Sequence, residues 1–339
     1  MRLTYEEERD LVRDVLLREG APGAPAEVQA RWLAEGDLRG HPSHGLQRLP
    51  VIVERIRRGL SDPAAEPQLT WRSDAAAVVD GRRGLGPWVA TRAVEGVVER
   101  ARTTGVALAA IHNSNHLGLL APYVEQIAAA GQLGVMLTTS EALVHPWDGA
   151  QAMVGTNPIA VGVPAQPEPF VLDMATGAIS MGKILDHRNR DLQLASGWAI
   201  DERGEATTDP HAARAISPFG GAKGYALALA FELIVAAATG SALGTDVTGT
   251  LDVETVCNKG DLIIAIDCAA LGFPDAAAAT SAYLGALRAT PARPETDGVS
   301  IPGDGARVRR ARNLEQGVEI SDAVWAQVAA LRERDGARA

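Results

Sequence analysis

The spacing of apolar residues changes near residue 75, and this change divides the chain into two kinds of structure. In the first part, apolar residues recur at the intervals of an amphipathic helix in three runs, over residues 4–18, 25–38 and 46–58. Thr4 followed by Glu7 has the spacing of a capping box, which marks the start of the first helix. Residues 1–72 are therefore predicted to form a mainly helical domain.

After residue 75, short apolar segments with the length of strands alternate with helical segments. This alternation predicts an α/β core over residues 73–289, and a turn-rich segment with one final helix, residues 290–339, is predicted to join the helical domain. We expect strands at residues 75–80, 106–111, 133–139, 159–164, 169–174 and 262–267, helices after Pro87, at 118–130 and after Gly224, and the final helix at 321–334.

Three glycines follow the first of these strands and invite comparison with a dinucleotide-binding turn. Gly81, Gly84 and Gly86 give the spacing G-x-x-G-x-G, whereas the Rossmann fingerprint is G-x-G-x-x-G. The following strand ends at His112, where that fingerprint would place an acidic residue for the ribose. The α/β core is therefore predicted to be non-Rossmann, with this segment as an ordinary turn between a strand and a helix.

Charge and composition narrow the class of ligand. The formal net charge of -10 argues against a nucleic-acid-binding surface, so the expected partner is a small molecule. The longest apolar stretch, residues 225–238, contains Glu232 and is shorter than the roughly 20 residues of a membrane helix, so we expect a buried helix and no membrane contact. Two cysteines without zinc-like spacing, and an N-terminus without a secretory signal pattern, indicate a cytoplasmic protein.

The segment HPSHGLQRLP holds residues with the chemistry for reducing a ketone. His44 titrates close enough to neutrality to give and retake a proton, and Arg48, four residues later on the same helical face, can hold a carboxylate through two hydrogen bonds. A helix capped by Ser43, with a structural His44 and a surface Arg48, fits the same spacing. A serine hydrolase using Ser43 is the rival enzyme class, but the sequence contains no G-x-S-x-G elbow.

Other polar segments interrupt apolar runs at places where ligands often bind. NSNHLG places His116 four residues after another histidine, but no third metal ligand stands near them, so no metal site is predicted and His116 is expected to line a cleft. The turn at Thr156 can present a hydroxyl, and the small residues after Asp173 allow a ligand to approach the backbone. Lys223 at a helix start suits an anion. A plain loop or a packing contact is the alternative for each of these.

The ordered set of segments HPSHGLQRLP, NSNHLG, GTNPIAVGVP, LDMATG, TTDP and GAKGYALAL resembles one family, the malate/L-lactate dehydrogenases with the related ureidoglycolate, sulfolactate and diketogulonate enzymes. The resemblance covers nearly the whole chain. It implies a non-Rossmann α/β fold that binds a nicotinamide cofactor, within a homodimer whose active sites lie near the subunit interface. It also implies an NAD(P)-dependent oxidoreductase that interconverts a small 2-oxo acid and its 2-hydroxy acid.

By position, the resemblance makes His44 the proton donor, Ser43 its hydrogen-bonding partner, and His116 the catalytic base named in the ureidoglycolate enzymes. It makes Arg48 the ligand of the substrate carboxylate and Thr156 a further substrate contact. The implied cofactor contacts are Ser140, Leu172, Asp173, Met174, Ala175, Thr176, Gly177, Ala178, Lys223, Gly224, Gly303 and Asp304.

The sequence also departs from parts of the family. Lys183 stands where the cyclic-imine reductases have an aspartate that completes a relay with the serine and histidine, which argues against imine reduction. The region from GKILD to TTDP resembles the ureidoglycolate enzymes most, so ureidoglycolate dehydrogenase is the alternative function. NAD is favoured over NADP, although Arg188 and Arg190 offer charges for a 2′-phosphate. A protein that keeps the fold and binds a metabolite without turnover is the non-enzymatic alternative.

Overall fold

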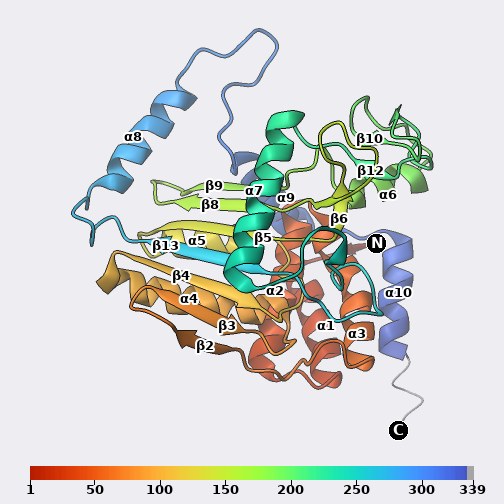
Figure 1. The fold of residues 1–339 in the computed structure, drawn as a ribbon, viewed down its shortest axis with the longest axis horizontal. Coiled ribbons are helices and arrows are strands. Elements are labelled where there is room, and N and C mark those ends of the chain that lie inside the picture. Colours follow the sequence, from red (N-terminus) through yellow and green to blue (C-terminus); the bar gives the residue numbers. More distant parts are fainter. Residues whose placement is uncertain (334–339) are drawn as a thin grey trace.

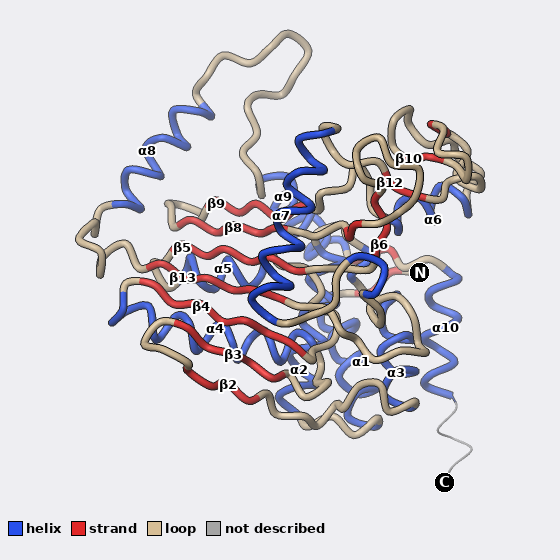
Figure 2. The backbone as a smooth tube through the Cα atoms, in the orientation of Figure 1, coloured by secondary structure: helices blue, strands red, loops and turns tan. Residues whose placement is uncertain are grey.

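The structure is a computed structural model that describes residues 1–333, and its centre is a seven-stranded sheet (Figures 1 and 2). Only β3 and β4 run parallel in this sheet, and its other neighbouring strands pair antiparallel. In spatial order the strands are β2 (Gln68–Trp71), β3 (Ala76–Asp80), β4 (Val106–His112), β13 (Asp261–Ile266), β5 (Leu133–Thr138), β8 (Ile159–Val163) and β9 (Phe170–Met174). The predicted α/β core is confirmed, and all six predicted strands lie in it.

Helices cover both faces of this sheet because the strands are apolar on both sides. Along β4, Ala109 and Ile111 face α4 (Gly86–Thr104) and α5 (Ala121–Ala129), while Leu108 and Ala110 face α7 (Ala222–Thr239) on the other side. Figure 1 shows α7 lying across the sheet on the face opposite to α4 and α5. The sheet is therefore the middle layer of three.

Helix α7 differs from its prediction as a buried helix. It packs on the sheet along one face, and only 28% of its residues are buried. Leu227, Leu233 and Ile234 point outwards with about half of their surface exposed. Periodicity did not reveal this because the helix is apolar around its whole circumference. Its length and composition also suit a membrane span, for which one such helix is weak evidence.

The one buried charged residue of α7, Glu232, ties this helix to a turn that carries a predicted substrate contact. The buried Glu232 carboxylate accepts hydrogen bonds from Asn157 Nδ2 at 2.7 Å, from the Gly155 amide at 3.1 Å and from the Gly244 amide at 2.6 Å. Leaving these donors unpaired in the interior would cost about 1–3 kcal/mol each. Glu232 therefore fixes the turn on either side of Thr156.

The N-terminal residues form a helical cluster as predicted, with α1 (Tyr5–Arg18), α2 (Gly23–Leu38) and α3 (Leu49–Arg57). The Thr4 capping box is present at α1. The third helix begins later than predicted: residues 42–44 and 46–48 form two 3-10 turns, separated by an extended Gly45. Strand β2, which ends just before residue 72, belongs to the central sheet.

The C-terminal segment returns to this helical cluster. Strand β1 (Arg2–Leu3) pairs with β14 (Val318–Glu319), and α10 (Asp322–Glu333) packs on α3 within one apolar core. The segment predicted to be turn-rich contains a regular helix, α9 (Asp304–Gln316), which the sequence pattern did not reveal because its apolar residues are few. Residues 334–339 of the predicted C-terminal segment lie outside the described residues.

Two further parts lie at the periphery. A small sheet has the order β11-β10-β12-β6-β7 and packs with α6 (Met181–Asn189) around a separate apolar cluster. Helix α8 (Ala276–Arg288) stands away from the body of the molecule (Figure 1). The small sheet consists of β6 (Ala142–Val144), β7 (Val154–Gly155), β10 (Ala199–Ile200), β11 (Ala206–Thr207) and β12 (Ala215–Ile216).

Candidate active site

A cavity of about 430 Å³ lies where the helical cluster meets the ends of β4, β5 and β9. Segments far apart in the sequence line it: the two 3-10 turns before α3, the loop after β4, the loop after β5, the turn before β8 and the end of β9. Among the residues predicted from the sequence, those that line it are Ser43, His44, Arg48, His116, Ser140, Thr156, Asp173, Met174 and Ala175.

His44 is a neutral imidazole in the wall of this cavity. Its Nδ1 lies 3.0 Å from Ser43 Oγ, and its ring lies 5.3 Å from the ring of His116, centroid to centroid. Burial lowers the pKa of His44 to about 3, and the nearby charge of Arg48 acts in the same direction. The ring is therefore uncharged at neutral pH before a substrate binds.

His116 has its proton position fixed by the backbone. The amide of Gly118 donates a hydrogen bond of 3.1 Å to His116 Nδ1, so a neutral ring carries its proton on Nε2. Burial and the charge of Arg48 also hold its pKa well below the usual range. His116 can therefore donate a hydrogen bond through Nε2, but this nitrogen is not free to accept a proton.

Arg48 brings a partly buried positive charge to the same cavity. One of its Nη atoms donates to the carbonyl of Thr250 at 2.6 Å, and burial lowers the pKa of its guanidinium. Glu141 in turn holds Thr250, because its carboxylate accepts from the Thr250 amide, the Thr250 hydroxyl and the Leu251 amide. Residues 250–251 thus connect the Glu141 carboxylate to the Arg48 guanidinium through hydrogen bonds.

Ser140 and Thr156 form a hydroxyl pair at the cavity wall. Their oxygens lie 3.1 Å apart, and the Thr156 amide donates to Ser140 Oγ at 2.9 Å. Thr176 lies behind this pair and donates from its hydroxyl to the carbonyl of Thr156 at 2.8 Å. Thr176 therefore supports the turn and does not itself line the cavity. The predicted cofactor residues Leu172, Gly177 and Ala178 do not line the cavity either.

Asp173 lines both the main cavity and a second cavity of about 400 Å³. Its carboxylate accepts from the amides of Leu120 and Ala121 at the start of α5, while burial raises its pKa to about 6. The two cavities share Asp173, His41 and Leu119. Together they offer an elongated space for a ligand larger than the substrate.

The predicted cofactor residues outside β9 are placed differently from one another. Gly303 lines the second cavity, whereas the Asp304 carboxylate is engaged by Arg288, Arg307 and the amide of Ile301. Lys223 is exposed at the start of α7 and Gly224 packs against the carbonyl of Phe219. The described chain does not bring Lys223 or Gly224 to either cavity.

The sequence interpretation missed several polar groups of the site. Lys259 lines the main cavity while it is buried and paired with Asp261. Its one signal was that it is one of three lysines in a chain with 32 basic residues. Glu141 and Thr250 also line the cavity, and only the fold brings them within reach of Arg48.

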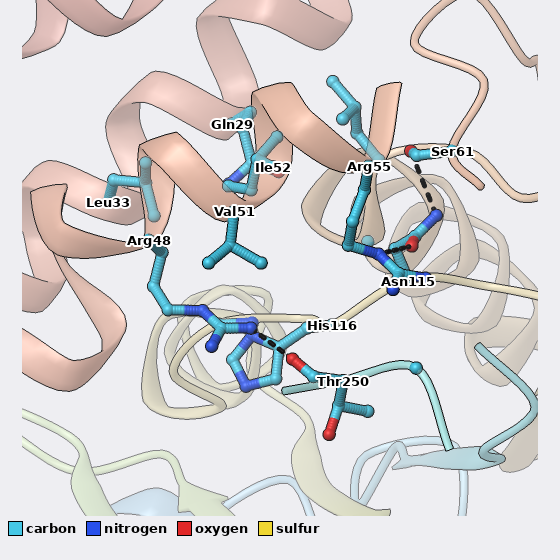
Figure 3. Close-up of a pocket in the computed structure, with 14 residues that line it drawn as sticks. Gln29, Leu33, Arg48, Val51, Ile52, Arg55, Ser61, Asn115, His116 and Thr250 are labelled. Carbon is cyan, nitrogen blue, oxygen red and sulfur yellow. Dashed lines mark hydrogen bonds between the residues drawn. The ribbon is translucent and has the colours of Figure 1, made fainter. Parts of the chain in front are cut away.

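A small chamber of about 30 Å³ lies beside the main cavity and shares Arg48, His116 and Thr250 with it (Figure 3). Arg55 Nε donates to Asn115 Oδ1 at 3.2 Å, and Asn115 Nδ2 donates to Ser61 Oγ at 3.1 Å. Figure 3 shows Arg55, Asn115 and Ser61 joined by these contacts, while His116 lies beside the separate contact of Arg48 with Thr250. The network therefore fixes the polar loop predicted to line a cleft.

Within residues 1–333, no group of three or more histidine, cysteine, aspartate or glutamate side chains has an arrangement that could hold a metal ion. The chemistry available at the site is that of imidazole, guanidinium, ammonium, carboxylate and hydroxyl groups.

Known proteins are similar to this chain in architecture and sequence. The family model described as malate/L-lactate dehydrogenase matches residues 3–329. L-sulfolactate dehydrogenase of Methanothermobacter thermautotrophicus is 33% identical, over 99% of this chain and 98% of that protein. Ureidoglycolate dehydrogenase (NAD(+)) of Escherichia coli is 30% identical, over 96% of this chain and 94% of that protein. The crystal structure of a dehydrogenase from Sinorhizobium meliloti superposes with a TM-score of 0.94 at 49% identity, covering 98% of each chain.

These matches span the helical cluster, the central sheet and every segment that lines the cavity. They also agree with the resemblance carried by the sequence motifs. The chain therefore belongs to the malate/L-lactate dehydrogenase family and is an oxidoreductase that interconverts a 2-oxo acid and its 2-hydroxy acid.

Proposed function

We propose that His44 transfers the proton and Arg48 holds the carboxylate in the reaction of a small 2-oxo acid. The observation that carries this proposal is the meeting of His44, His116 and Arg48 at one buried cavity. Reduction of a ketone needs a proton on its oxygen, and a carboxylate beside that ketone needs a cation. The three side chains provide a proton carrier, a second hydrogen-bond donor and the cation.

The two histidines take different roles in this proposal. When His44 donates from Nδ1 to Ser43 Oγ, its Nε2 is free to accept the proton of a 2-hydroxyl group. His116 is held in the opposite tautomer by Gly118, so its Nε2–H donates a hydrogen bond to the same substrate oxygen. His44 is therefore the acid and base, and His116 orients and polarises the substrate oxygen.

Arg48 couples substrate binding to proton transfer. Its charge contributes to the low pKa of His44 in the free protein. A bound substrate carboxylate neutralises this charge, which raises the pKa of His44 towards the range in which it can deliver a proton. A ligand without a carboxylate would leave His44 unprotonated and the reduction slow.

A nicotinamide cofactor fits the two connected cavities. Residues Asp173–Ala175 at the end of β9 line the first cavity, and Gly303 lines the second. When bound, the reduced cofactor supplies the hydride for C2 of the substrate. We favour NAD, because Arg188 donates to the carbonyl of Pro210 and Arg190 pairs with Asp186, so neither arginine lines the cavities.

The substrate class follows from the relatives and from the charges of the cavity. Besides Arg48, the hydroxyl groups of Ser140 and Thr156 line the cavity, so it suits small acids with a second polar group. Ureidoglycolate dehydrogenase activity is the second candidate, favoured by the region from GKILD to TTDP and by the relative of that name. We infer a cytoplasmic location, since both cysteines are free thiols.

A spectrophotometric screen tests this function. Pyruvate, oxaloacetate, sulfopyruvate, oxalurate, diketogulonate and cyclic imines are each assayed with NADH and with NADPH. We expect turnover with a non-cyclic 2-oxo acid and a preference for NADH. Tight cofactor binding without turnover of any member of the panel would instead support a metabolite-binding protein, and a clear preference for a cyclic imine would contradict the proposed class.

We also propose a homodimer that covers the outer face of α7. This face exposes Leu233 to 50% and Ile234 to 48%, and contiguous apolar surface of this kind marks protein interfaces. Light scattering is expected to give the mass of a dimer for the parent and of a monomer for the Leu233→Asp, Ile234→Asp double variant. Val308→Asp on α9, where Val308 is 69% exposed, is the matched control and should remain dimeric. A monomeric parent at micromolar concentration would contradict the proposal.

A further inference from the structure

Two carboxyl groups are buried side by side beneath the segment that carries His44. Glu8 on α1 has no exposed surface, and Asp37 near the end of α2 is 5% exposed. The two carboxyls are close enough to share a hydrogen bond. No ion pair within residues 1–333 involves either of them. Buried carboxyl groups without a cation need another source of stabilisation.

The carboxylate of Asp37 binds the backbone next to the catalytic histidine. Its Oδ2 accepts a hydrogen bond of 2.6 Å from the amide of Leu46. The close approach requires glycine on both sides, because a Cβ at Gly45 would overlap with the Asp37 carboxyl and one at Gly36 would overlap with the carbonyl of His44. The end of α2 therefore holds the backbone of residues 44–46 in place.

Glu8 completes the contact from the other side. Both of its carboxyl oxygens are buried and accept no hydrogen bond from any donor in the described chain. Asp37 is the only titratable group that acts on Glu8 among the described residues. Two adjacent carboxylates cannot both ionise without water or a cation. Burial, with the nearby Asp37, raises the pKa of Glu8 well above its usual range, and burial raises the pKa of Asp37 to about 6. A single proton held by Glu8 and donated to Asp37 satisfies both groups.

The other described elements that pack around Glu8 and Asp37 place no charged group against the two carboxyls. Helix α9 contacts the end of α2 through Asn313 and Arg309, but these side chains donate to the backbone carbonyls of residues 37–39 and not to the Asp37 carboxyl. Helix α10 and the 3-10 turns contribute apolar side chains to the same core. Within the described chain, no further charged group is near enough to change the ionisation of the pair.

We propose that Glu8 and Asp37 share one proton and act together as positioning residues for His44. Protonated Glu8 keeps Asp37 ionised and pointing at Leu46, and Asp37 keeps the 44–46 backbone at the distance at which His44 meets the substrate oxygen. Removal of the shared proton places two negative charges in contact, separates α1 from α2 and moves His44. The positioning role rests on the proposed function of His44. The proton shared by Glu8 and Asp37 is independent of that function.

Two variants of Glu8 separate its proton from its hydrogen bond. Glu8→Gln keeps an N–H donor to Asp37 at nearly the same size, and Glu8→Leu keeps the size without a donor. Glu6→Gln, on the exposed face of α1, is the matched control. For each folded variant we measure kcat and KM for oxidation of the 2-hydroxy acid, the direction in which neutral His44 causes no alkaline decline. The measurements run from pH 6 to about pH 10, a span that covers the raised pKa of a buried carboxyl.

The expected results distinguish positioning from general stability. Glu8→Leu should lower kcat about 10- to 100-fold, as misplacement of a reacting group does, with little change in the KM of the cofactor. Glu8→Gln should keep most of the neutral-pH activity and lose the alkaline decline in kcat that the parent and Glu6→Gln show. An unchanged kcat in folded Glu8→Leu, or identical alkaline profiles of Glu8→Gln and the parent, would overturn the proposal.

An infrared measurement tests the proton without turnover. The parent at neutral pH should show the carbonyl stretch of a protonated carboxylic acid that disappears in Glu8→Gln and remains in Glu6→Gln. Its absence in the parent would refute the shared proton, whatever the substrate screen finds. If the stretch is present but the protein turns over none of the substrates, the proposed function is refuted while the proton shared by Glu8 and Asp37 is supported.

Discussion

Replacing His44 with glutamine is expected to lower kcat by about 10²- to 10⁴-fold in both directions, the contribution of a positioned acid or base. Glutamine occupies a similar volume and hydrogen bonds to Ser43, but it cannot carry a proton to the substrate. Stopped-flow measurement of the nicotinamide absorbance in single turnovers isolates this step from product release. Binding of the cofactor should change little, since the residues expected to hold it lie on other segments.

His116→Gln is the matched comparison. Glutamine retains an N–H donor at the position from which His116 Nε2–H points to the substrate oxygen. The loss in kcat should therefore be smaller than for His44→Gln. If His116→Gln is the more damaging variant and His44→Gln retains most of its turnover, the proton belongs to His116 and the proposed roles are reversed.

The pH dependence gives a second readout of the same prediction. Because the pKa of His44 is lowered to about 3 in the free protein, its protonated fraction falls about tenfold for each pH unit above that value. We therefore expect kcat/KM for reduction to fall as pH rises, while kcat/KM for oxidation is lost only as pH falls through the pKa of His44. Glutamine at position 44 should remove this decline.

Replacing Arg48 with methionine is expected to raise the KM of the 2-oxo acid by about 30-fold or more, because losing one member of a buried charge pair costs roughly 2–5 kcal/mol. The substrate carboxylate would then enter a cavity in which the guanidinium is missing and no equivalent donor replaces it. The KM of the cofactor should remain close to the parent value. Initial rates over a range of both substrates measure the two constants separately.

Arg48→Lys shows whether the charge alone is sufficient. Lysine keeps the positive charge but loses the planar pair of donors and the contact with the Thr250 carbonyl. We expect an intermediate KM, with Arg58→Lys at the exposed end of α3 as the control that leaves KM unchanged. An unchanged KM in Arg48→Met would place the substrate carboxylate elsewhere in the cavity, with Lys259 as the next candidate.

The sequence predicted regular elements best where one spacing persisted over several turns or a full strand. Helix α1 has a capping box and an apolar stripe, and β4 and β13 are continuous apolar runs bounded by polar turns. The predictions failed where the pattern was uniform or weak. Helix α7 is apolar on all sides, so its exposed face was hidden, and α9 has too few apolar residues to show a stripe.

The candidate site was predicted only in part. Ser43, His44 and Arg48 are close in sequence, so their association needed no long-range information. The network that fixes them uses residues outside this segment: Asp37 accepts a hydrogen bond from the Leu46 amide, and Glu141 holds Thr250, whose carbonyl accepts from Arg48. In the sequence, a single carboxylate in a helix or loop cannot be distinguished from a surface charge, because its burial depends on tertiary packing.

The sequence by itself determined the alternation of strands and helices, the family and the chemical identity of the reacting groups. Local spacing and side-chain type are enough for these, because periodicity and functional groups are properties of the chain. Only the tertiary structure decided that His44 is neutral, which nitrogen of His116 bears the proton, and that Glu8 meets Asp37. Burial and the distances between charges set these properties, and both arise only when segments far apart in the chain pack together.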